Sequence, residues 1–290
     1  MQRRVFQARL FVVVLVALYA GAVWVVPELS FTQAKTEPTL YVHFLDVGQG
    51  DAILIETPAG DQVLIDGGPD AAVLQHLAAH MPFIDRTIEV VVGTHPDLDH
   101  VGGLSDVLAQ YRVPTILTTE AAGASAESAA WVTAVAAEEA QVYDVRGGEV
   151  YQLGASTTLT ILSPNYDPAR LNSNAGSIVA LLTFGDTAFM LTGDAPQGVE
   201  QYLADTYSDD LHAAVLKLGH HGSDTSTHPD FLQAVNPQFA VVSAGRNNRY
   251  NHPDPDVLAR VSAYTDAQIV STQHGTVSFR SDGTTVELIR

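Results

Sequence analysis

Short apolar runs rich in Val, Ile and Leu recur along the chain, and segments with helical spacing of apolar residues separate many of them. Apolar runs of four to eight residues that end in turn residues predict strands. These strands are expected at residues 40–46, 52–57, 62–66, 88–94, 114–119, 158–162, 177–184, 187–193, 213–219, 239–244, 267–272, 276–281 and 285–289. Helices, many with Pro, Ser, Asp or Gly near their first residue, are expected at 70–81, 102–111, 125–140, 196–206, 228–235 and 254–264.

The order of these elements predicts an α/β (α+β) fold. The early strands come in hairpin-like groups and the helices follow between strands, so the sheets are expected to be mixed. Helices packed on two sheets are the expected architecture. We expect no break between domains and no internal repeat from residue 40 to the end of the chain.

The first thirty residues have a different pattern. Three arginines precede an uncharged apolar run at residues 10–26, and Pro27 ends that run. A helix of this run would be about 25 Å long, close to the ~30 Å hydrocarbon core of a bilayer. Positive charge before the run predicts an uncleaved membrane anchor with its N-terminus in the cytoplasm.

A cleaved signal peptide is the alternative for this segment, and "RRVF" at residues 3–6 also resembles a twin-arginine export signal. Both alternatives place the remaining chain outside the cytoplasm, either membrane-anchored or secreted. We therefore divide the chain into a signal or anchor segment (1–30), a linker (31–39) and a catalytic domain (40–290).

The sequence "VVVGTHPDLDHVGGL" (90–104) places four titratable side chains directly after an apolar strand. An extended segment would put His95, Asp97 and Asp99 on one side, and a turn at Gly102-Gly103 would bring His100 beside them. Carboxylates are costly to gather unless a cation neutralises them. The sequence thus indicates a metal site, although an exposed acidic loop that caps the next helix is the simpler alternative.

Three further strands end in polar groups. "LIDGG" ends in Asp66, "FMLTGDA" ends in Asp194, and "VLKLGHHGS" carries Lys217, His220 and His221. Each motif alone is ordinary, since a Gly-Asp pair is a common turn and a His pair is often on the surface. Their joint occurrence, together with the HxDxDH motif, is what makes the pattern specific.

With "HFLDVGQGDAILIE", "NSNAGSIVALLTFG" and "NRYNHP", these motifs resemble the metallo-β-lactamase-fold hydrolases of the competence ComEC type. The resemblance covers about residues 40–290. It implies a four-layered αβ/βα sandwich with a two-metal site along one edge of the sheets. We expect this chain to correspond to the hydrolase domain of that family without its large multi-span channel portion.

The resemblance implies a ligand set in three parts. One ion would be bound by His95 and Asp97. The second would be bound by Asp99, which we also count as catalytic, with His100 and one of His220 and His221. Asp194 would bridge the two ions. Oxygen ligands replace histidines of the wider superfamily at Asp97 and in "NSNAGS", where Asn174 and Ser177 are candidate substrate contacts. This change moves the preference from zinc toward harder ions such as Mn²⁺.

Other candidates surround the expected metal pair. Lys217 and His252 are candidates for phosphate contact or leaving-group protonation, although an exposed strand-end lysine and a structural loop histidine are the alternatives. Asn248 is a candidate substrate contact beside His252. The residues expected to shape the turn beside the site or to support it from behind are Asp46, Gln49, Asp51 and Asp66.

Composition restricts the function. The chain has 290 residues, no Cys, two Lys and a formal charge of −19. It therefore has no thiolate ligand or Cys nucleophile, and a nucleic-acid substrate would need a local basic or metal-rich patch. The acidic surface is also compatible with adaptation to salt.

We expect an extracytoplasmic, metal-dependent hydrolase with two divalent ions (Mn or Zn). The expected activity is that of a phosphodiesterase or nuclease, with a phosphodiester such as DNA as substrate. One alternative is a hydrolase of a non-nucleic ester, namely a phosphorylcholine ester, a lactone or a β-lactam. The other is a non-catalytic subunit of a DNA-uptake or envelope complex.

Overall fold

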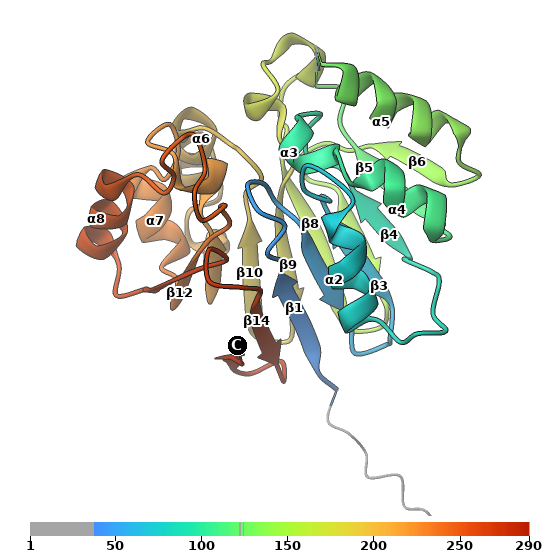
Figure 1. Cartoon of the computed structure of the whole chain (residues 1–290). Helices are drawn as coiled ribbons and strands as arrows, with labels where there is room; N and C mark the ends of the chain where they lie inside the picture. Colours follow the sequence, from blue (N-terminus) through green and yellow to red (C-terminus); the bar gives the residue numbers. More distant parts are fainter. Residues whose placement is uncertain (1–37, 122, 124, 290) are drawn as a thin grey trace, which may run out of the picture. The chain divides into compact units, whose positions relative to one another are not determined.

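The computed structural model describes residues 38–121, 123 and 125–289, which form two mixed sheets (Figure 1). The first sheet has the order β15 (Val286–Leu288), β14 (Val277–Ser281), β1 (Leu40–Phe44), β2 (Ile53–Glu56), β3 (Gln62–Ile65), β4 (Val90–Val92), β5 (Thr115–Thr118), β6 (Gln141–Asp144). The second has the order β13 (Gln268–Ser271), β12 (Phe239–Val242), β11 (Val215–Lys217), β10 (Thr187–Leu191), β9 (Val179–Phe184), β8 (Thr157–Ser163), β7 (Val150–Leu153).

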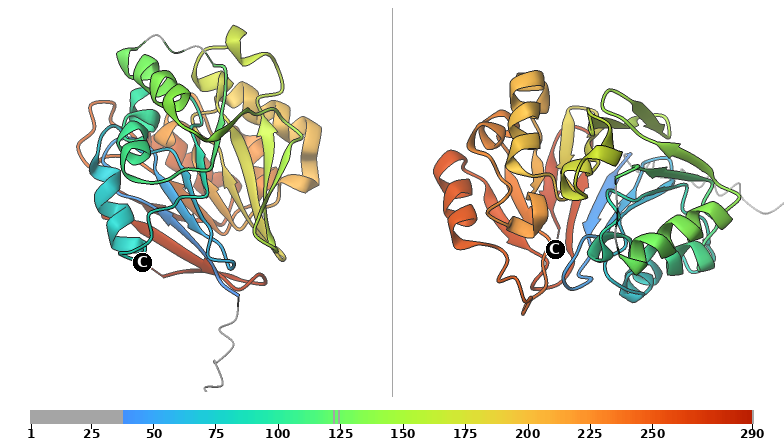
Figure 2. Two further views of the ribbon diagram at one scale, coloured as in Figure 1. Left: turned by 90° about the vertical axis from the view of Figure 1, so that its right-hand side faces the viewer. Right: turned by 90° about the horizontal axis from the view of Figure 1, so that it is seen from above.

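Helices cover the outer face of each sheet (Figure 2). The first sheet is covered by α2 (Ala72–His80), α4 (Leu104–Gln110) and α5 (Ala126–Ala137). The second is covered by α6 (Gln197–Tyr207), α7 (Pro229–Val235) and α8 (Pro255–Tyr264). Short helical turns complete the chain: α3 (Leu98–Val101), η1 (Pro168–Arg170), η2 (Asn174–Gly176), η3 (Ser208–Leu211) and η4 (Gly219–Gly222).

The two sheets bury their inner faces against each other. Phe279 on β14 is fully buried there, and its ring lies 6.0 Å from that of Phe44, 6.2 Å from Phe189 and 5.2 Å from Phe239. These partners come from both sheets. The expected four-layered sandwich is thus confirmed, with one apolar layer between the sheets and one under each group of helices.

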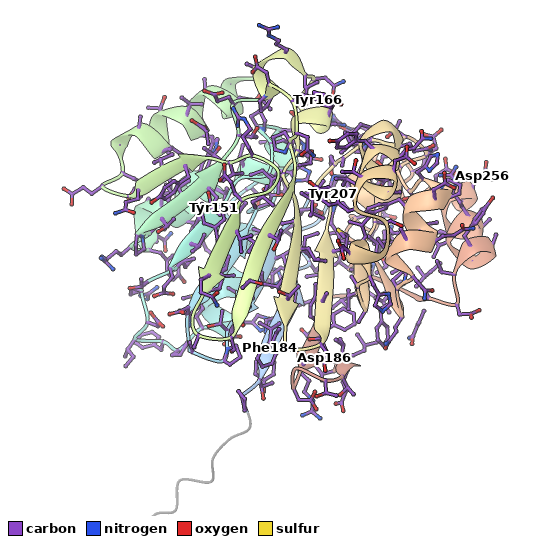
Figure 3. The ribbon with its side chains drawn as sticks, turned by 180° about the vertical axis from the view of Figure 1, so that it is seen from behind. Tyr151, Tyr166, Phe184, Asp186, Tyr207 and Asp256 are labelled. Carbon is purple, nitrogen blue, oxygen red and sulfur yellow. The ribbon has the colours of Figure 1, made fainter. Side chains whose placement is uncertain are left out.

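Parallel pairing places several loops at one edge of the sandwich. The first sheet has a parallel set β3–β4–β5–β6, and the second has a parallel set β10–β11–β12–β13. The carboxyl ends of parallel strands meet at the same edge of a sheet. The β9–β10 turn, with Phe184 and Asp186, lies at the opposite end of the second sheet from the loop that carries Tyr166 (Figure 3).

Every predicted strand and helix contains an element of the structure, but β6, β7 and α3 were not predicted. β6 has no buried residue and β7 only one, so neither has the apolar run that marks a central strand. The prediction of an extended segment through Asp99 was wrong, because the helical turn α3 begins at Leu98, whereas the predicted turn at Gly102-Gly103 is present. The two glycines also permit close packing, since a Cβ at Gly102 would lie 2.3 Å from the carbonyl oxygen of Pro69.

The predicted anchor or signal segment (1–30) and most of the linker (31–39) lie outside the described residues. Among the residues that the structure does describe, none of the helices combines the length and apolarity needed to span a bilayer.

Truncation of the central aromatic ring tests the inter-sheet layer. Phe279→Ala should lower the free energy of unfolding by about 3–5 kcal/mol, because it removes a fully buried ring and leaves a cavity. Denaturant unfolding of the full chain measures this loss. The control Phe83→Ala removes a ring that is 88% exposed and should change stability by less than about 0.5 kcal/mol. Equal losses in both variants would contradict this account of the core.

Candidate metal centre

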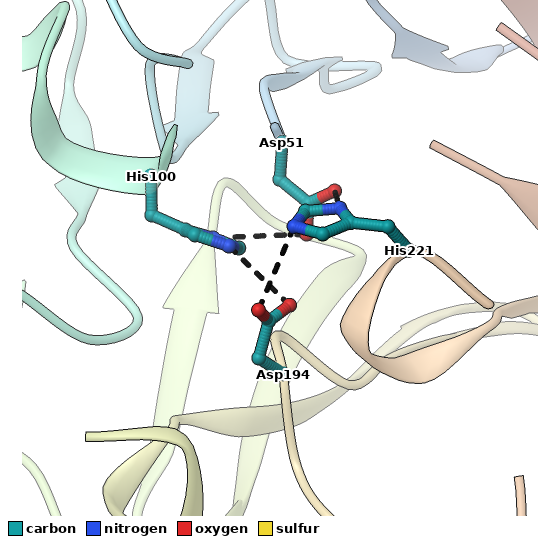
Figure 4. Close-up of side chains that lie close together, drawn as sticks. All are labelled: Asp51, His100, Asp194 and His221. Atoms are coloured by element: carbon teal, nitrogen blue, oxygen red, sulfur yellow. Dashed lines mark ion pairs between the residues drawn. The ribbon is translucent and has the colours of Figure 1, made fainter. Parts of the chain in front are cut away.

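Asp194, directly after β10, is the common neighbour of four histidines. Its carboxylate oxygens lie 3.8 Å from Nε2 of His95, 3.3 Å from that of His100, 3.7 Å from that of His220 and 3.5 Å from that of His221. These histidines follow β4 and β11, so both sheets contribute to the cluster. Figure 4 shows Asp194 facing His100 and His221, with Asp51 beside them.

In each of the three buried histidines, Nδ1 lies within hydrogen-bond distance of a neighbouring oxygen, so Nε2 points toward Asp194. His100 Nδ1 donates to Asp66 Oδ2 at 2.8 Å, and His221 Nδ1 donates to the carbonyl oxygen of Ser243 at 2.9 Å. His95 Nδ1 lies 3.1 Å from Thr94 Oγ1. All three Nε2 atoms are buried without a hydrogen-bond partner, as is Asp194 Oδ1.

These orphaned atoms fit a metal ion. Buried polar atoms are nearly always satisfied, and an imidazole whose Nδ1 is held by a carboxylate or carbonyl presents Nε2 as a metal ligand. The donor set of imidazole nitrogens and carboxylate oxygens suits divalent cations such as Zn²⁺ and Mn²⁺. We therefore describe this cluster as a candidate metal centre.

Asp97 and Asp99 extend the centre on two sides. Asp97 Oδ2 lies 3.7 Å from His95 Nε2, and Asp99 Oδ2 lies 3.3 Å from His221 Nε2. The geometry therefore pairs His95 with Asp97 and places His221, rather than His220, beside Asp99. His220 Nε2 also lies beside Asp194 Oδ2, and the His220 side chain is 28% exposed.

The field of the carboxylates favours positive charge at the centre. Burial opposes the charged form of His221, but Asp194 and Asp51 outweigh it and raise the pKa to about 9. Burial is likewise outweighed at His100, where Asp194 and Asp66 raise the pKa well above its usual value. Burial dominates at His95 and lowers its pKa to about 3. A site that stabilises imidazolium in this way also attracts a divalent cation, which competes with the protons.

Lys217 is not at the surface. Its side chain is fully buried, its Nζ lies 2.5 Å from Asp51 Oδ2, and it donates to the carbonyl oxygen of Gly193 at 2.8 Å. Direct phosphate contact by Lys217 does not agree with this position. The lysine is the buried counter-ion of Asp51. The sequence predicted Asp51 only as a residue of the turn beside the site, whereas the structure places it within the cluster. The signal for Asp51 in the sequence was its position directly after "GQG", in the loop from β1 to β2.

Asp66 supports the centre from behind, as its strand-end position predicted. Besides His100, it accepts hydrogen bonds from the backbone N–H of Thr94 at 2.8 Å and from Thr94 Oγ1 at 2.7 Å. Asp66, His220 and His221 all have left-handed backbone angles, with φ of 59°, 49° and 57°. Non-glycine residues in this region carry strain, which the surrounding contacts must hold.

The "NSNAGS" segment (172–177) contacts two of the candidate ligands, Asp97 and Asp194. Ser177 is fully buried and its Oγ accepts from the backbone N–H of Asp194 at 3.3 Å. Asn174 accepts from Ser173 Oγ, and the same hydroxyl lies 3.2 Å from Asp97 Oδ2. Sequence analysis did not select Ser173, whose place beside Asp97 depends on η2.

The "NRYNHP" segment contains one residue aimed at the centre. His252 lies 5.7 Å from His220 between ring centroids, and its Nδ1 is buried without a partner. Asn248 instead orders the loop, since its amide donates to the carbonyl oxygens of Gly245 and His252. Asp46 also orders a turn, because its backbone N–H donates to Thr276 and its carbonyl oxygen accepts from a histidine of α2.

A cleft of about 570 Å³ opens beside Asp97 and Asp99. Its other lining residues are Gln49, Pro69, Leu98, Ser125, Arg249 and Tyr250. Arg249 is the one cation among these described lining residues, and its guanidinium lies 4.7 Å from the centroid of the Tyr250 ring. The cleft is therefore lined both by two carboxylates and by an exposed Arg–Tyr pair.

A family model described as "Metallo-beta-lactamase superfamily" matches residues 45–246. The chain belongs to this superfamily. The matched region contains the whole cluster, and superfamily membership together with the cluster supports a metal-dependent hydrolase.

Curated relatives agree with the competence-type resemblance. The chain is 30% identical to "ComE operon protein 3" of Bacillus subtilis, over 82% of this chain and 33% of the relative. It is 32% identical to "Recombination protein 2" of Haemophilus influenzae, over 82% of this chain and 28% of the relative. The chain thus spans about a third of the length of these relatives.

A solved structure shows the same fold. The metallo-beta-lactamase fold protein YhfI from Bacillus subtilis matches with a TM-score of 0.58 and 11% identity, over 83% of this chain and 99% of that one. Agreement at this level of identity concerns the fold alone.

The role of Asp66 can be separated from direct coordination. Asp66→Asn should weaken divalent-metal binding about 10- to 100-fold, because the amide no longer holds His100 with its Nε2 atom facing inward. Isothermal titration of the full chain with Mn²⁺ or Zn²⁺ measures the affinity. Asp106→Asn, an exposed change on α4, is the control and should bind like the unmodified protein. An unchanged affinity in Asp66→Asn would show that His100 does not need this partner.

Proposed function

We propose that this chain is a metal-dependent phosphodiesterase that acts on nucleic acid. The observation that carries the proposal is Asp194, which faces four inward-pointing imidazoles while Asp97 and Asp99 extend the donor set toward an open cleft. Two divalent ions at such a site would activate water and stabilise the charge of an in-line phosphoryl displacement.

Different residues of the site would bind the two ions, orient the ligands and transfer the proton. His95 and Asp97 would hold one ion, His100, His221 and Asp99 the other, and Asp194 would lie between them. Asp66 and Thr94 orient imidazoles, and Lys217 balances the charge of Asp51 within the protein. His252, with its unpartnered Nδ1, is the candidate to move a proton to the leaving oxygen.

The Arg249–Tyr250 pair would bind the substrate outside the reacting centre. A guanidinium offers paired donors to a phosphate, and an exposed aromatic ring offers a stacking surface to a base. Such a local cation would attract the substrate to the cleft, although a chain with a formal charge of −19 repels polyanions overall. The flat ring and the single cation favour a single-stranded substrate over a duplex.

The competence-type resemblance supports a role in competence, and we propose a place in DNA uptake for this chain. We propose an extracytoplasmic position, on the strength of the arginines before the apolar run at residues 10–26. Protease added to intact cells or spheroplasts would reach the domain in that case, and full protection would reverse the orientation.

Loss of a ligand should abolish phosphodiester hydrolysis. Asp99→Ala should lower the rate by several orders of magnitude, because water activation and charge stabilisation depend on the same residues. Hydrolysis of bis-p-nitrophenyl phosphate and of single-stranded DNA, with Mn²⁺ or Zn²⁺ added, measures the effect, with Asp106→Ala as control. Nitrocefin should remain intact throughout. Rapid nitrocefin turnover with untouched diesters would assign the chain to lactam hydrolysis instead.

Loss of the cleft cation should affect binding more than chemistry. Arg249→Ala should reduce kcat/KM on single-stranded DNA about 10- to 100-fold, mainly through KM, and should weaken the dependence on salt. The matched control is Arg246→Ala, which removes an exposed arginine bonded to the carbonyl oxygen of Gln273 and should leave KM unchanged. If both variants behaved alike, the cleft would not be the binding surface.

A further inference from the structure

A second group of metal-binding side chains lies on the outer face of the first sheet. His43 lies in β1, Glu56 ends β2 and His80 ends α2, and each offers a ligand atom within 4.8 Å of the others. We propose that these residues form a separate site for one zinc ion, distinct from the centre around Asp194.

The sheet orients His43 for this role. Its register partner on β14 is Ser278, whose Oγ lies 2.8 Å from His43 Nδ1. With Nδ1–H donating to this hydroxyl, the Nε2 lone pair faces Glu56, and a ligand atom of His80 lies within 4.8 Å of the ligand atoms of both residues. Nε2 lies 3.1 Å from Glu56 Oε1, and the His80 ring centroid lies 4.2 Å from that of His43. His43 is 5% exposed, so its imidazole is fixed by packing.

The position of α2 separates this site from the catalytic edge. The helix begins beside the loop that follows Asp66 and ends at His80, so its nine residues carry His80 about 12 Å away from that edge. His43 likewise lies within β1, whereas the cluster residue Asp51 follows the end of that strand. An ion bound here would not touch the reacting groups.

The chemistry of the donors favours zinc. Two imidazole nitrogens and one carboxylate oxygen form a common zinc set that leaves a fourth position for water. The proportion of nitrogen donors is higher here than around Asp194, where four imidazoles share the site with Asp97, Asp99 and Asp194 itself, so harder ions should prefer the latter. The C-terminal end of α2 also favours positive charge, because its last carbonyl groups carry the negative end of the helix dipole.

Bound zinc would stabilise the fold by tying the end of α2 to two strands. The ion binds the folded chain, in which the three donors meet, and so shifts the unfolding equilibrium. Without an ion, the hydrogen bonds and ring contacts of these side chains alone would hold the cluster together. The two cases differ in zinc stoichiometry and in the response of Tm to zinc.

Zinc titration in a background that disables the catalytic centre tests the proposal. The full chain carrying Asp194→Ala should bind one Zn²⁺ at this site and should show a higher Tm with zinc. Addition of His80→Ala should weaken this binding at least about 10-fold and remove the Tm response. The control is His212→Ala, an exposed histidine elsewhere, which should leave both unchanged. Equal zinc binding with and without His80→Ala would overturn the proposal.

A second comparison covers the case in which Asp194→Ala does not fold. His80→Ala in the otherwise unmodified chain should lose one zinc per chain by elemental analysis while it retains phosphodiester hydrolysis. Glu56→Gln, which preserves shape but removes the charge, should also weaken the same zinc. Unaltered zinc content in both variants would show that hydrogen bonds alone hold the cluster together.

Discussion

Burial of charge at one edge of the sandwich is the constraint on which the rest of the structure depends. Asp51, Asp66 and Asp194 are each no more than 3% exposed, and an isolated buried carboxylate is far too costly to keep ionised. Neighbouring groups balance the negative charge of each carboxylate: Lys217 pairs with Asp51, Thr94 donates to Asp66, and imidazoles surround Asp194. The arrangement that stabilises the ionised carboxylates also attracts a divalent cation. Stability and metal affinity therefore have a common origin here.

The sandwich makes this concentration of charge possible. Apolar side chains of both sheets form a continuous layer beneath the site, so the loops above it rest on a rigid base. Strained backbone at Asp66 and at the His220–His221 pair is compatible with such a base because the surrounding contacts fix these conformations. Close approach of loops is equally necessary, since a side chain at Gly50 would meet the carbonyl oxygen of Asp99. The metal centre thus depends on packing as much as on its ligands.

Sequence patterns predicted the elements that carry strong apolar runs, and they located the ligands that follow those runs directly. They did not reveal partners that are distant in sequence. Asp51 and Lys217 form one ion pair across 166 positions (217 minus 51), so the lysine was interpreted as a phosphate contact instead of a buried counter-ion. Edge strands such as β6 escaped detection because both of their faces are exposed. The three residues of the proposed zinc site lie on separate elements, and only the register of β1 with β2 and β14 brings them together.

The two halves of the catalytic centre differ in their access to solvent, which has a consequence for the proposed reaction. The Asp97 side chain is 41% exposed and faces the cleft, whereas His100 and His221 are buried and held by Asp66 and Ser243. The half beside Asp97 also has fewer donors, since it contains His95 and Asp97, whereas the other half contains His100, His221 and Asp99. Of the two proposed ions, the one beside Asp97 should therefore be held less tightly and exchange more easily. Because this half borders the Arg249–Tyr250 cleft, a substrate phosphate that enters the cleft would add oxygen ligands where the protein supplies the fewest. In the proposed reaction, substrate binding and completion of the metal centre would then be one event.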